Sequence, residues 1–442
     1  MIPKYFPVEL EDKILFWMDN NQDSQLHLII NLNGFVDYSI LQRAVRLAID
    51  IEPVMGCRFV VKHFVPYWER LDNLDEIEHV HLVETGESDD ELFRFLGDVW
   101  VETTLGPQIK VWVIRSDRDI VCIKVSHVAM DAAAIKDLAY LLASTYNELI
   151  KNPHFTPETA IKKSRSFRQV SKHFSSLDKF KIIRRTVRDF ASYAIPLEPP
   201  HAGETNSKPS DRRLILKTFD SGMYKVVKEF GRLNNATVND IMVAVFIKSF
   251  YETVNPDPRA LRRLLITCDL RRYIPSGNAE AFCNLSGFIY VNVGKNRTSS
   301  LKEIICNVRD QMNRLKNDSI GMGNLPISMV LFKIMPFPWA LWIHDKISDF
   351  LKRQIMSTGS VSPVFTNTGI IDHNRIVFND VKPENAHINA IYSYPPVLSV
   401  SLNGFKDTLT LTSGFCSNTV DEAMVKLLFE MMEQNIISLH IH

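Results

Sequence analysis

The sequence carries no excess of charge of either sign. Its 442 residues include 51 Lys and Arg and 51 Asp and Glu. A chain without net charge exerts no overall attraction on nucleic acid or on an acidic membrane. We therefore expect small or neutral partners, and we exclude nucleic acid.

Cysteine is scarce, and the cysteines are dispersed along the chain. They form no CxxC pair and no Cys/His cluster at zinc spacing, which argues against a structural metal site. We expect reduced, mostly buried thiols and no bound metal. The six residues are Cys57, Cys122, Cys268, Cys283, Cys306 and Cys416.

Long apolar runs are also missing. The N-terminus has acidic residues and prolines where a signal peptide needs a basic start and an apolar run, so we expect a cytoplasmic protein. The most apolar stretch, 325–344, contains Lys333 and three prolines, which argues against a membrane span. For 327–342 we favour packing in the core or between lobes over a lining for a lipid-like chain or a peripheral membrane contact.

The length predicts two compact lobes, since 442 residues exceed one ordinary core. We place an N-terminal lobe at 1–165, a connection at 166–211 and a C-terminal lobe at 212–442. The connection contains loop-like sequence and a basic segment, which we interpret as a solvated helix face rather than a nucleic-acid site.

The hydrophobic pattern alternates between the strand and helix periods. Apolar residues predict a strand at 25–34, a helix at 39–51 and an antiparallel hairpin with arms at 108–115 and 120–126. A helix follows Asp131. The second half repeats this alternation, so we predict an α/β protein of the α+β type, with mixed sheets flanked by helices. Its strands are expected at 213–219, 263–269, 285–293, 361–367, 388–394, 397–404 and 407–414, and its helices at 221–233, 238–251, 299–316 and from 419 on.

A histidine followed four residues later by an acid occurs twice, as His127 with Asp131 and as His154 with Glu158. With 13 His and 51 acidic residues, chance gives about 1.5 such pairs, so spacing alone proves nothing. The first pair lies where an apolar strand ends and an apolar helix begins. An imidazole held there by rigid elements suits a general base. The equally weighted alternative is a core histidine, with Asp131 capping the helix.

The segment SHVAMDA at 126–132 resembles the HHxxxDG motif of the chloramphenicol acetyltransferase-like superfamily. This superfamily includes condensation domains of nonribosomal peptide synthetases and wax ester and alcohol acyltransferases. Further segments are similar to it in the same order along nearly the full chain. They are LAIDIEPVMGCRF at 48–60, ATVNDIMVAVF at 236–246, CDLRRYIP at 268–275, NLSG at 284–287 and FTNTG at 365–369.

The resemblance implies two similar lobes in a V-shaped pseudo-dimer with a central tunnel. A segment near 355–372 would cross back toward the N-terminal lobe. His127 matches the catalytic base of the motif, and Asp131 would form a supporting salt bridge with Arg271. Contacts to the oxyanion or the acceptor are expected from Ser126, Thr366 and Asn367.

Two residues depart from the motif. Ser126 replaces its first histidine, at a position that mainly packs. Ala132 replaces its glycine, and an added Cβ there would narrow the donor tunnel or exclude a positive φ. This departure leaves a catalytically degenerate protein open as an alternative.

The resemblance therefore implies a free-standing acyltransferase that uses acyl-CoA or the phosphopantetheine thioester of a carrier protein as co-substrate. The acceptor would be an amine or an alcohol, and no cofactor would be bound permanently. One alternative is a condensation-like protein that binds a carrier protein or a small ligand without turnover. Another is hydrolysis of the thioester by water.

Overall fold

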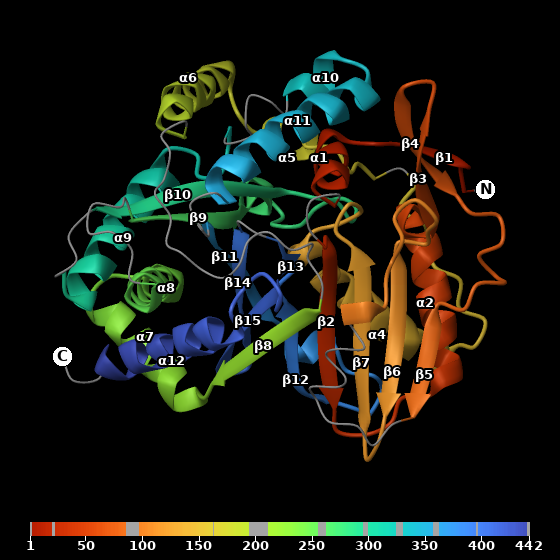
Figure 1. Cartoon of the computed structure of the whole chain (residues 1–442). Coiled ribbons are helices and arrows are strands. Elements are labelled where there is room, and N and C mark those ends of the chain that lie inside the picture. Colours follow the sequence, from red (N-terminus) through yellow and green to blue (C-terminus); the bar gives the residue numbers. More distant parts are fainter. Residues whose placement is uncertain are drawn as a thin grey trace.

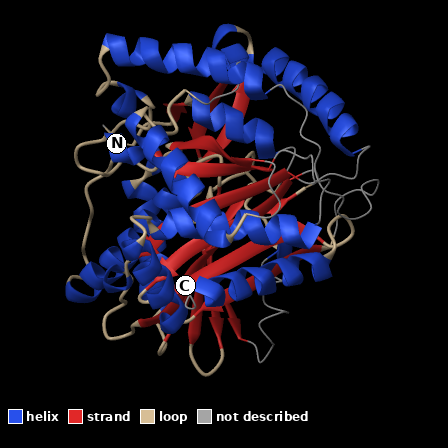
Figure 2. Cartoon of the chain, turned by 90° about the vertical axis from the view of Figure 1, so that its left-hand side faces the viewer, coloured by secondary structure: helices blue, strands red, loops and turns tan. Residues whose placement is uncertain are grey.

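The computed structural model describes residues 2–19, 23–84, 97–161, 163–193, 211–254, 262–294, 299–323, 330–356, 362–394 and 397–439. These residues form two large mixed β-sheets with helices packed on them, side by side in Figure 1. Figure 2 shows strands through the interior and helices outside. The predicted α/β fold with mixed sheets and flanking helices is confirmed.

The first sheet belongs mainly to the N-terminal part of the chain. Its strands lie in the order β12 (Pro383–Asn389), β2 (Gln25–Leu32), β7 (Asp119–Ser126), β6 (Ile109–Arg115) and β5 (Val80–Glu84). The predicted hairpin is present as β6 and β7, which pair antiparallel from Arg115 opposite Asp119. Val121, Ile123 and Val125 alternate along β7 and point into one core, as the strand period requires.

Two helices cover that core, α2 (Tyr38–Ile51) and α4 (Ala132–Lys151). Each begins with an aspartate whose side chain accepts a hydrogen bond from a backbone N–H of the first turn, Asp37 from Ile40 and Asp131 from Ala134. Such N-caps satisfy helix donors that lack intrahelical partners. The cap of α4 thereby sets the point at which the loop after β7 ends.

The second sheet lies in the C-terminal part. Its strands run in the order β10 (Ser286–Gly294), β9 (Arg262–Asp269), β11 (Ser362–Ile371), β14 (Val397–Phe405), β15 (Thr408–Cys416) and β13 (Tyr392–Ser393). A further strand, β8 (Arg212–Phe219), also pairs with β15. β11 runs parallel to β9 and β14, so the sheet is mixed.

Four helices pack around the second core: α7 (Ser221–Leu233), α8 (Val238–Val254), α9 (Leu301–Asn317) and α12 (Glu422–Ser438). α8 is apolar on nearly all sides and is deeply buried. Before it, Thr237 and Asp240 exchange side-chain to backbone hydrogen bonds, which is the capping-box arrangement.

One strand crosses between the two parts of the chain. β12 joins the first sheet by pairing antiparallel with β2. β11 belongs to the second sheet, and only its last residue, Ile371, packs into the first core. The segment that enters the N-terminal sheet is 383–389. The predicted crossing near 355–372 toward the N-terminal lobe, of which 357–361 lie outside the described residues, stays a prediction. Alternating apolar strands look alike in sequence, and pairing partners decide which one crosses.

The remaining elements gather at one end of the molecule, along the upper edge of Figure 1. They are a small sheet of β1 (Tyr5–Pro7), β4 (Val65–Arg70) and β3 (Cys57–Lys62), and the helices α1 (Leu10–Asp19), α5 (Arg168–Ser171), α6 (Ser176–Tyr193), α10 (Leu331–Ile334) and α11 (Phe337–Met356). Of the predicted connection, 194–210 lie outside the described residues. Within the described part of the chain, no helix has the length and apolar character that crossing a bilayer requires.

All six cysteines are unpaired, and four of them are buried, as predicted. Within the described ranges, no group of three or more His, Cys, Asp or Glu side chains is arranged to hold a metal ion.

Candidate active site

His127 lies in the loop between β7 and α4, and its side chain is partly exposed. Its backbone N–H donates to the carbonyl of Ser24 at 2.9 Å. Its ring Nδ1 lies 3.0 Å from the carbonyl oxygen of Met130. A carbonyl only accepts, so in the neutral ring Nδ1 carries the hydrogen and Nε2 keeps a lone pair. The loop thus fixes which ring nitrogen of His127 carries the hydrogen.

Asp131 ends this loop and is almost fully buried. Its carboxylate accepts two hydrogen bonds from the Arg271 guanidinium, both at 2.9 Å, and one from the backbone N–H of Leu285 at 2.8 Å. Burial alone would raise the pKa of Asp131, but the charge and hydrogen bonds of Arg271 outweigh it and hold that pKa below its usual value. The predicted pair of Asp131 and Arg271 is present.

Arg271 comes from the short 3₁₀ helix η2 (Leu270–Tyr273), directly after β9 of the second sheet. Besides Asp131, it donates to the carbonyl of Cys283 and to Asp269, each at 3.2 Å. Burial opposes its charge, yet Asp131 raises the pKa of the guanidinium above its ordinary value. The C-terminal part of the chain therefore holds the loop of the N-terminal part through a charged, bidentate contact.

Two further carbonyls of the loop also have partners. Asn284 Nδ2 donates to the carbonyl of Val128 at 3.0 Å, and Arg165 donates to that of Ala129 at 2.7 Å. Arg165 in turn makes a bidentate pair with Asp12 of α1, at 2.7 and 3.0 Å. Sequence reasoning did not assign these roles to Asn284, Arg165 and Asp12. Their acceptors include backbone carbonyls, which leave no mark in a sequence.

Ser126 is fully buried at the end of β7. Its hydroxyl shares a 2.7 Å hydrogen bond with Thr103 and accepts one from the backbone N–H of Val128 at 3.3 Å. These bonds support the start of the loop. The Ser126 hydroxyl, for which we predicted a contact with the oxyanion or the acceptor, therefore already has two protein partners.

Ala132 is the first residue of α4, and its φ is not among the positive values found in the described backbone. The expected conflict between its Cβ and a left-handed backbone is therefore absent. The predicted narrowing of a donor tunnel at Ala132 stays a prediction.

Thr366 and Asn367 lie on β11, whose end reaches α4 through a 2.5 Å hydrogen bond from Lys136 to the carbonyl of Thr368. The Asn367 amide donates to Asn239 of α8 at 2.9 Å and accepts from the backbone N–H of Gly369 at 2.9 Å. Both ends of this amide thus hold protein groups. The predicted contacts of Thr366 and Asn367 with a reacting group stay predictions.

A small cavity of about 30 Å³ adjoins the residues that hold the loop. Its wall includes 284–288, Glu11 of α1 and Phe167. Burial raises the pKa of Glu11 to about 7. The volume suits a water-sized group.

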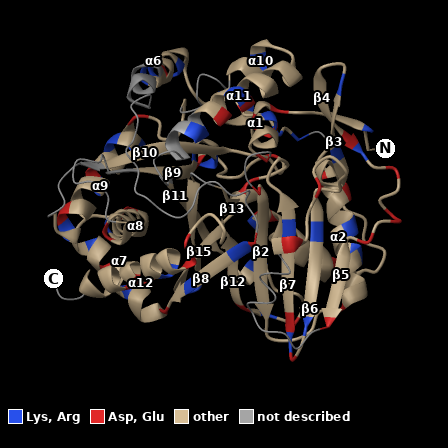
Figure 3. Ribbon diagram, in the orientation of Figure 1, with Lys and Arg blue, Asp and Glu red and all other residues tan. Residues whose placement is uncertain are grey.

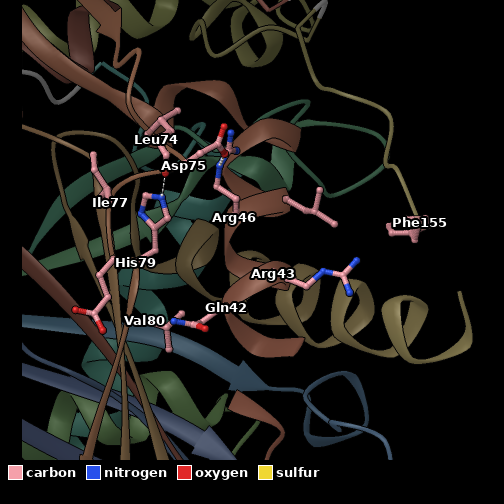
Figure 4. A pocket seen from close by; sticks show the side chains of 11 residues that line it. Gln42, Arg43, Arg46, Leu74, Asp75, Ile77, His79, Val80 and Phe155 are labelled. Carbon is pink, nitrogen blue, oxygen red and sulfur yellow. Dashed lines mark hydrogen bonds and ion pairs between the residues drawn. The ribbon is translucent and has the colours of Figure 1, made fainter. Parts of the chain in front are cut away.

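A larger open cavity of about 380 Å³ lies elsewhere, between α2 and the chain leading into β5 (Figure 4). Its cationic side chains already have protein partners. Arg46 pairs with Asp50 at 2.9 Å and with Asp75 at 2.6 Å, and Arg43 donates to the carbonyl of Pro153. None of the residues that line it belongs to the loop of His127, so we do not place the chemistry there.

Comparison with known proteins shows what the chain resembles. No protein-family model and no curated protein sequence matches it. Solved structures match the chain over nearly its full length. Trichothecene 15-O-acetyltransferase TRI3 from Fusarium sporotrichioides matches with a TM-score of 0.71 at 12% identity, covering 97% of this chain and 94% of that chain.

Two further structures extend this likeness. The first condensation domain of the CDA synthetase matches with a TM-score of 0.70 at 12% identity, covering 98% of this chain and 95% of that chain. Polyketide synthase associated protein 5 from Mycobacterium tuberculosis matches with a TM-score of 0.66 at 13% identity, covering 97% and 98%. The chain therefore has the fold of condensation domains and chloramphenicol acetyltransferase-like enzymes, as predicted.

Proposed function

Given that fold, we propose that the chain is an acyltransferase in which His127 is the general base. The observation that carries the proposal is the hydrogen bond between His127 Nδ1 and the Met130 carbonyl, which places the ring hydrogen on Nδ1 and the lone pair on Nε2. Asp131 with Arg271, and Arg165 with Asp12, support the loop around this ring.

The donor in this proposal is a thioester, either acyl-CoA or an acyl group on the phosphopantetheine of a carrier protein. The acceptor is an amine or an alcohol. As the acceptor nitrogen or oxygen attacks the thioester carbonyl, Nε2 of His127 takes its proton. The tetrahedral intermediate then collapses, the carbon–sulfur bond breaks and the leaving thiolate receives that proton. The products are an amide or ester and a free thiol, and no resident cofactor takes part.

The test measures free thiol and acylated product with a panel of acyl thioesters, each offered amines and alcohols. We expect His127→Ala to lower the rate by about 10²- to 10⁴-fold, the usual effect of losing a positioned base. His154→Ala is the matched control, because His154 has the same spacing to an acid but lies in an exposed loop. It should transfer as fast as the wild type.

Three results would contradict the proposal. Transfer by His127→Ala at the wild-type rate would remove the assigned base. Thiol release without any acceptor would indicate hydrolysis. Binding of every thioester without thiol release would indicate a non-catalytic binding protein.

A further inference from the structure

One end of the molecule exposes a group of bulky apolar side chains, each 58–73% accessible to solvent. They come from the β3–β4 turn, from α6 and from α10 and α11. We call this group the apolar end. Its members are Phe64, Val65, Leu177, Phe180, Ile183, Ile334, Trp339, Trp342 and Phe350.

The three parts of the apolar end lie together. The ring of Phe64 contacts the ring of Trp339 at 6.5 Å between centroids, and the backbone N–H of Phe337 donates to the carbonyl of Phe64 at 3.2 Å. The turn and α11 are thus joined. Figure 1 shows α6 along the same upper edge as α10 and α11. A flat partner could therefore contact all three parts.

Basic residues are interspersed with these apolar side chains. Seven exposed cations lie on the same elements, namely Lys62, Lys179, Lys181, Arg184, Lys333, Lys346 and Arg353. The acidic residues of this region are fewer, and one of them, Asp345, accepts a 3.0 Å hydrogen bond from Trp17. Figure 3 shows the blue segments on α6 and α11. The whole chain has no net charge, so the positive charge at this end is local.

We propose that the apolar end binds the surface of an anionic lipid bilayer. Tryptophan and other apolar side chains next to Lys and Arg, on helices that do not span, are typical of segments that lie in the headgroup region. The cations add attraction to anionic lipids. A carrier protein would also match the cations, but exposed Trp and Phe rings on three separate elements are typical of side chains that enter the headgroup region of a bilayer.

The inner sides of α10 and α11 connect this surface to the candidate active site. Phe332, Phe337 and Ala340 pack in one apolar cluster with Val128 and Ala129, the two residues that follow His127. On the proposed function, a lipophilic donor or acceptor dissolved in the bilayer would lie one helix layer from the loop. The membrane contact itself does not depend on catalysis.

Co-sedimentation with vesicles tests the proposal on the full chain. The vesicles contain phosphatidylcholine alone or phosphatidylcholine with phosphatidylserine. We expect binding to the anionic vesicles that weakens as salt rises, and Trp339→Ser with Trp342→Ser should weaken it about tenfold or more. Lys181→Glu with Lys346→Glu should also weaken it, by about fivefold for each charge lost near the surface. The matched control is Leu233→Ser with Leu427→Ser, two exposed leucines of α7 and α12, and it should bind as the wild type does.

Several outcomes would overturn the proposal. They are no binding of the wild type to anionic vesicles at low salt, equal binding by the tryptophan variant and the wild type, and binding to a purified acyl carrier protein but to no vesicle. His127→Ala should bind vesicles normally. The tryptophan variant should keep its activity on a short, water-soluble thioester, so a failure of the membrane proposal and a failure of the proposed function give different results.

Discussion

Two arginines with little solvent exposure hold the loop of His127 from different parts of the molecule. Arg271, from the second sheet, binds Asp131 within the loop through two hydrogen bonds of 2.9 Å. Arg165, from the segment between α4 and α5, binds the Ala129 carbonyl, and its acidic partner, Asp12, lies outside the loop on α1. The first arginine thus anchors a charge of the loop itself, and the second anchors only its backbone.

The comparison indicates different functions for the two contacts. Without Arg271, a charged carboxylate would stay buried in the loop with only neutral donors. Without Arg165, the buried carboxylate of Asp12 would likewise keep only neutral donors, the indole N–H of Trp68 at 2.9 Å and the backbone N–H of Glu9 at 3.2 Å. We therefore expect both contacts to contribute to stability, the first by more because the Arg271 side chain is 4% exposed and that of Arg165 is 10% exposed. The second should also act on the position of the loop, because Arg165 donates to the Ala129 carbonyl.

Arg271→Met is expected to have the largest effect. Breaking one side of a buried ion pair costs about 3 to 5 kcal/mol, because the remaining charge keeps its desolvation penalty without its partner. Unfolding in urea, followed by circular dichroism, measures this loss. Acyl transfer should fall as well, since the loop loses its attachment to the second sheet.

Arg58→Met is the matched control for this variant. Arg58 pairs with Glu69 at 2.8 Å on the surface, where its side chain is 45% exposed. Loss of such a pair costs about 0 to 1 kcal/mol. If both variants lost the same amount, the pair of Asp131 and Arg271 would not be the anchor that its geometry indicates.

Arg165→Met should cost less, about 3 kcal/mol, the lower end of the range for breaking a buried ion pair, because Arg165 is more exposed than Arg271. Relative to this loss of stability, the loss of acyl transfer should be large, because the Ala129 carbonyl close to His127 loses its donor. Arg165→Lys separates the two functions. A lysine can restore the charge beside Asp12, but it cannot reach Asp12, Ala129 and Phe282 together as the guanidinium does. Full recovery of transfer by the lysine variant would contradict this assignment.

Much of the fold could be predicted from the sequence because its signals are local. The hairpin of β6 and β7, helix α4 and the cap at Thr237 follow from hydrophobic period and capping chemistry within a few residues. The crossing of β12 could not be predicted in the same way. Its place beside β2 depends on pairing between residues far apart in the chain, and nothing in the strand itself indicates its partner.

The candidate site likewise contains residues that the sequence indicates and residues that it does not. His127 and Asp131 stand out because a rigid strand and helix flank them, and Arg271 was reached through a resemblance rather than through local pattern. Arg165 lies 153 residues from Asp12, and it also donates to the carbonyls of Ala129 and Phe282. A contact of this kind becomes visible only when the chain is folded.

A third contact joins the two parts of the chain at Glu52, which has no hydrogen-bonded arginine among the described residues. Glu52 accepts a 3.1 Å hydrogen bond from the backbone N–H of Phe282, three residues before the Leu285 that binds Asp131. Burial raises the pKa of Glu52 to about 7 from its ordinary 4.5. A buried carboxylate beside a bonded arginine thus stays charged, and one without it favours its proton.

The free energy of unfolding should therefore depend on pH in opposite directions through Glu52 and through Asp131. The folded state binds the Glu52 proton more tightly than the unfolded state does. Its contribution is thus full below about pH 4.5 and is lost as pH rises through about 7. The contribution of Asp131, whose folded pKa is lowered, is instead lost as the solution becomes acidic.

Glu52→Gln keeps an acceptor for the backbone N–H of Phe282 and removes the titration. Its free energy of unfolding, relative to that of the wild type, should therefore rise by about 1 to 3 kcal/mol between pH 5 and pH 8. Urea unfolding at both pH values measures this gain, with exposed Glu158→Gln as the control, and an equal difference at both pH values would show that Glu52 is charged throughout.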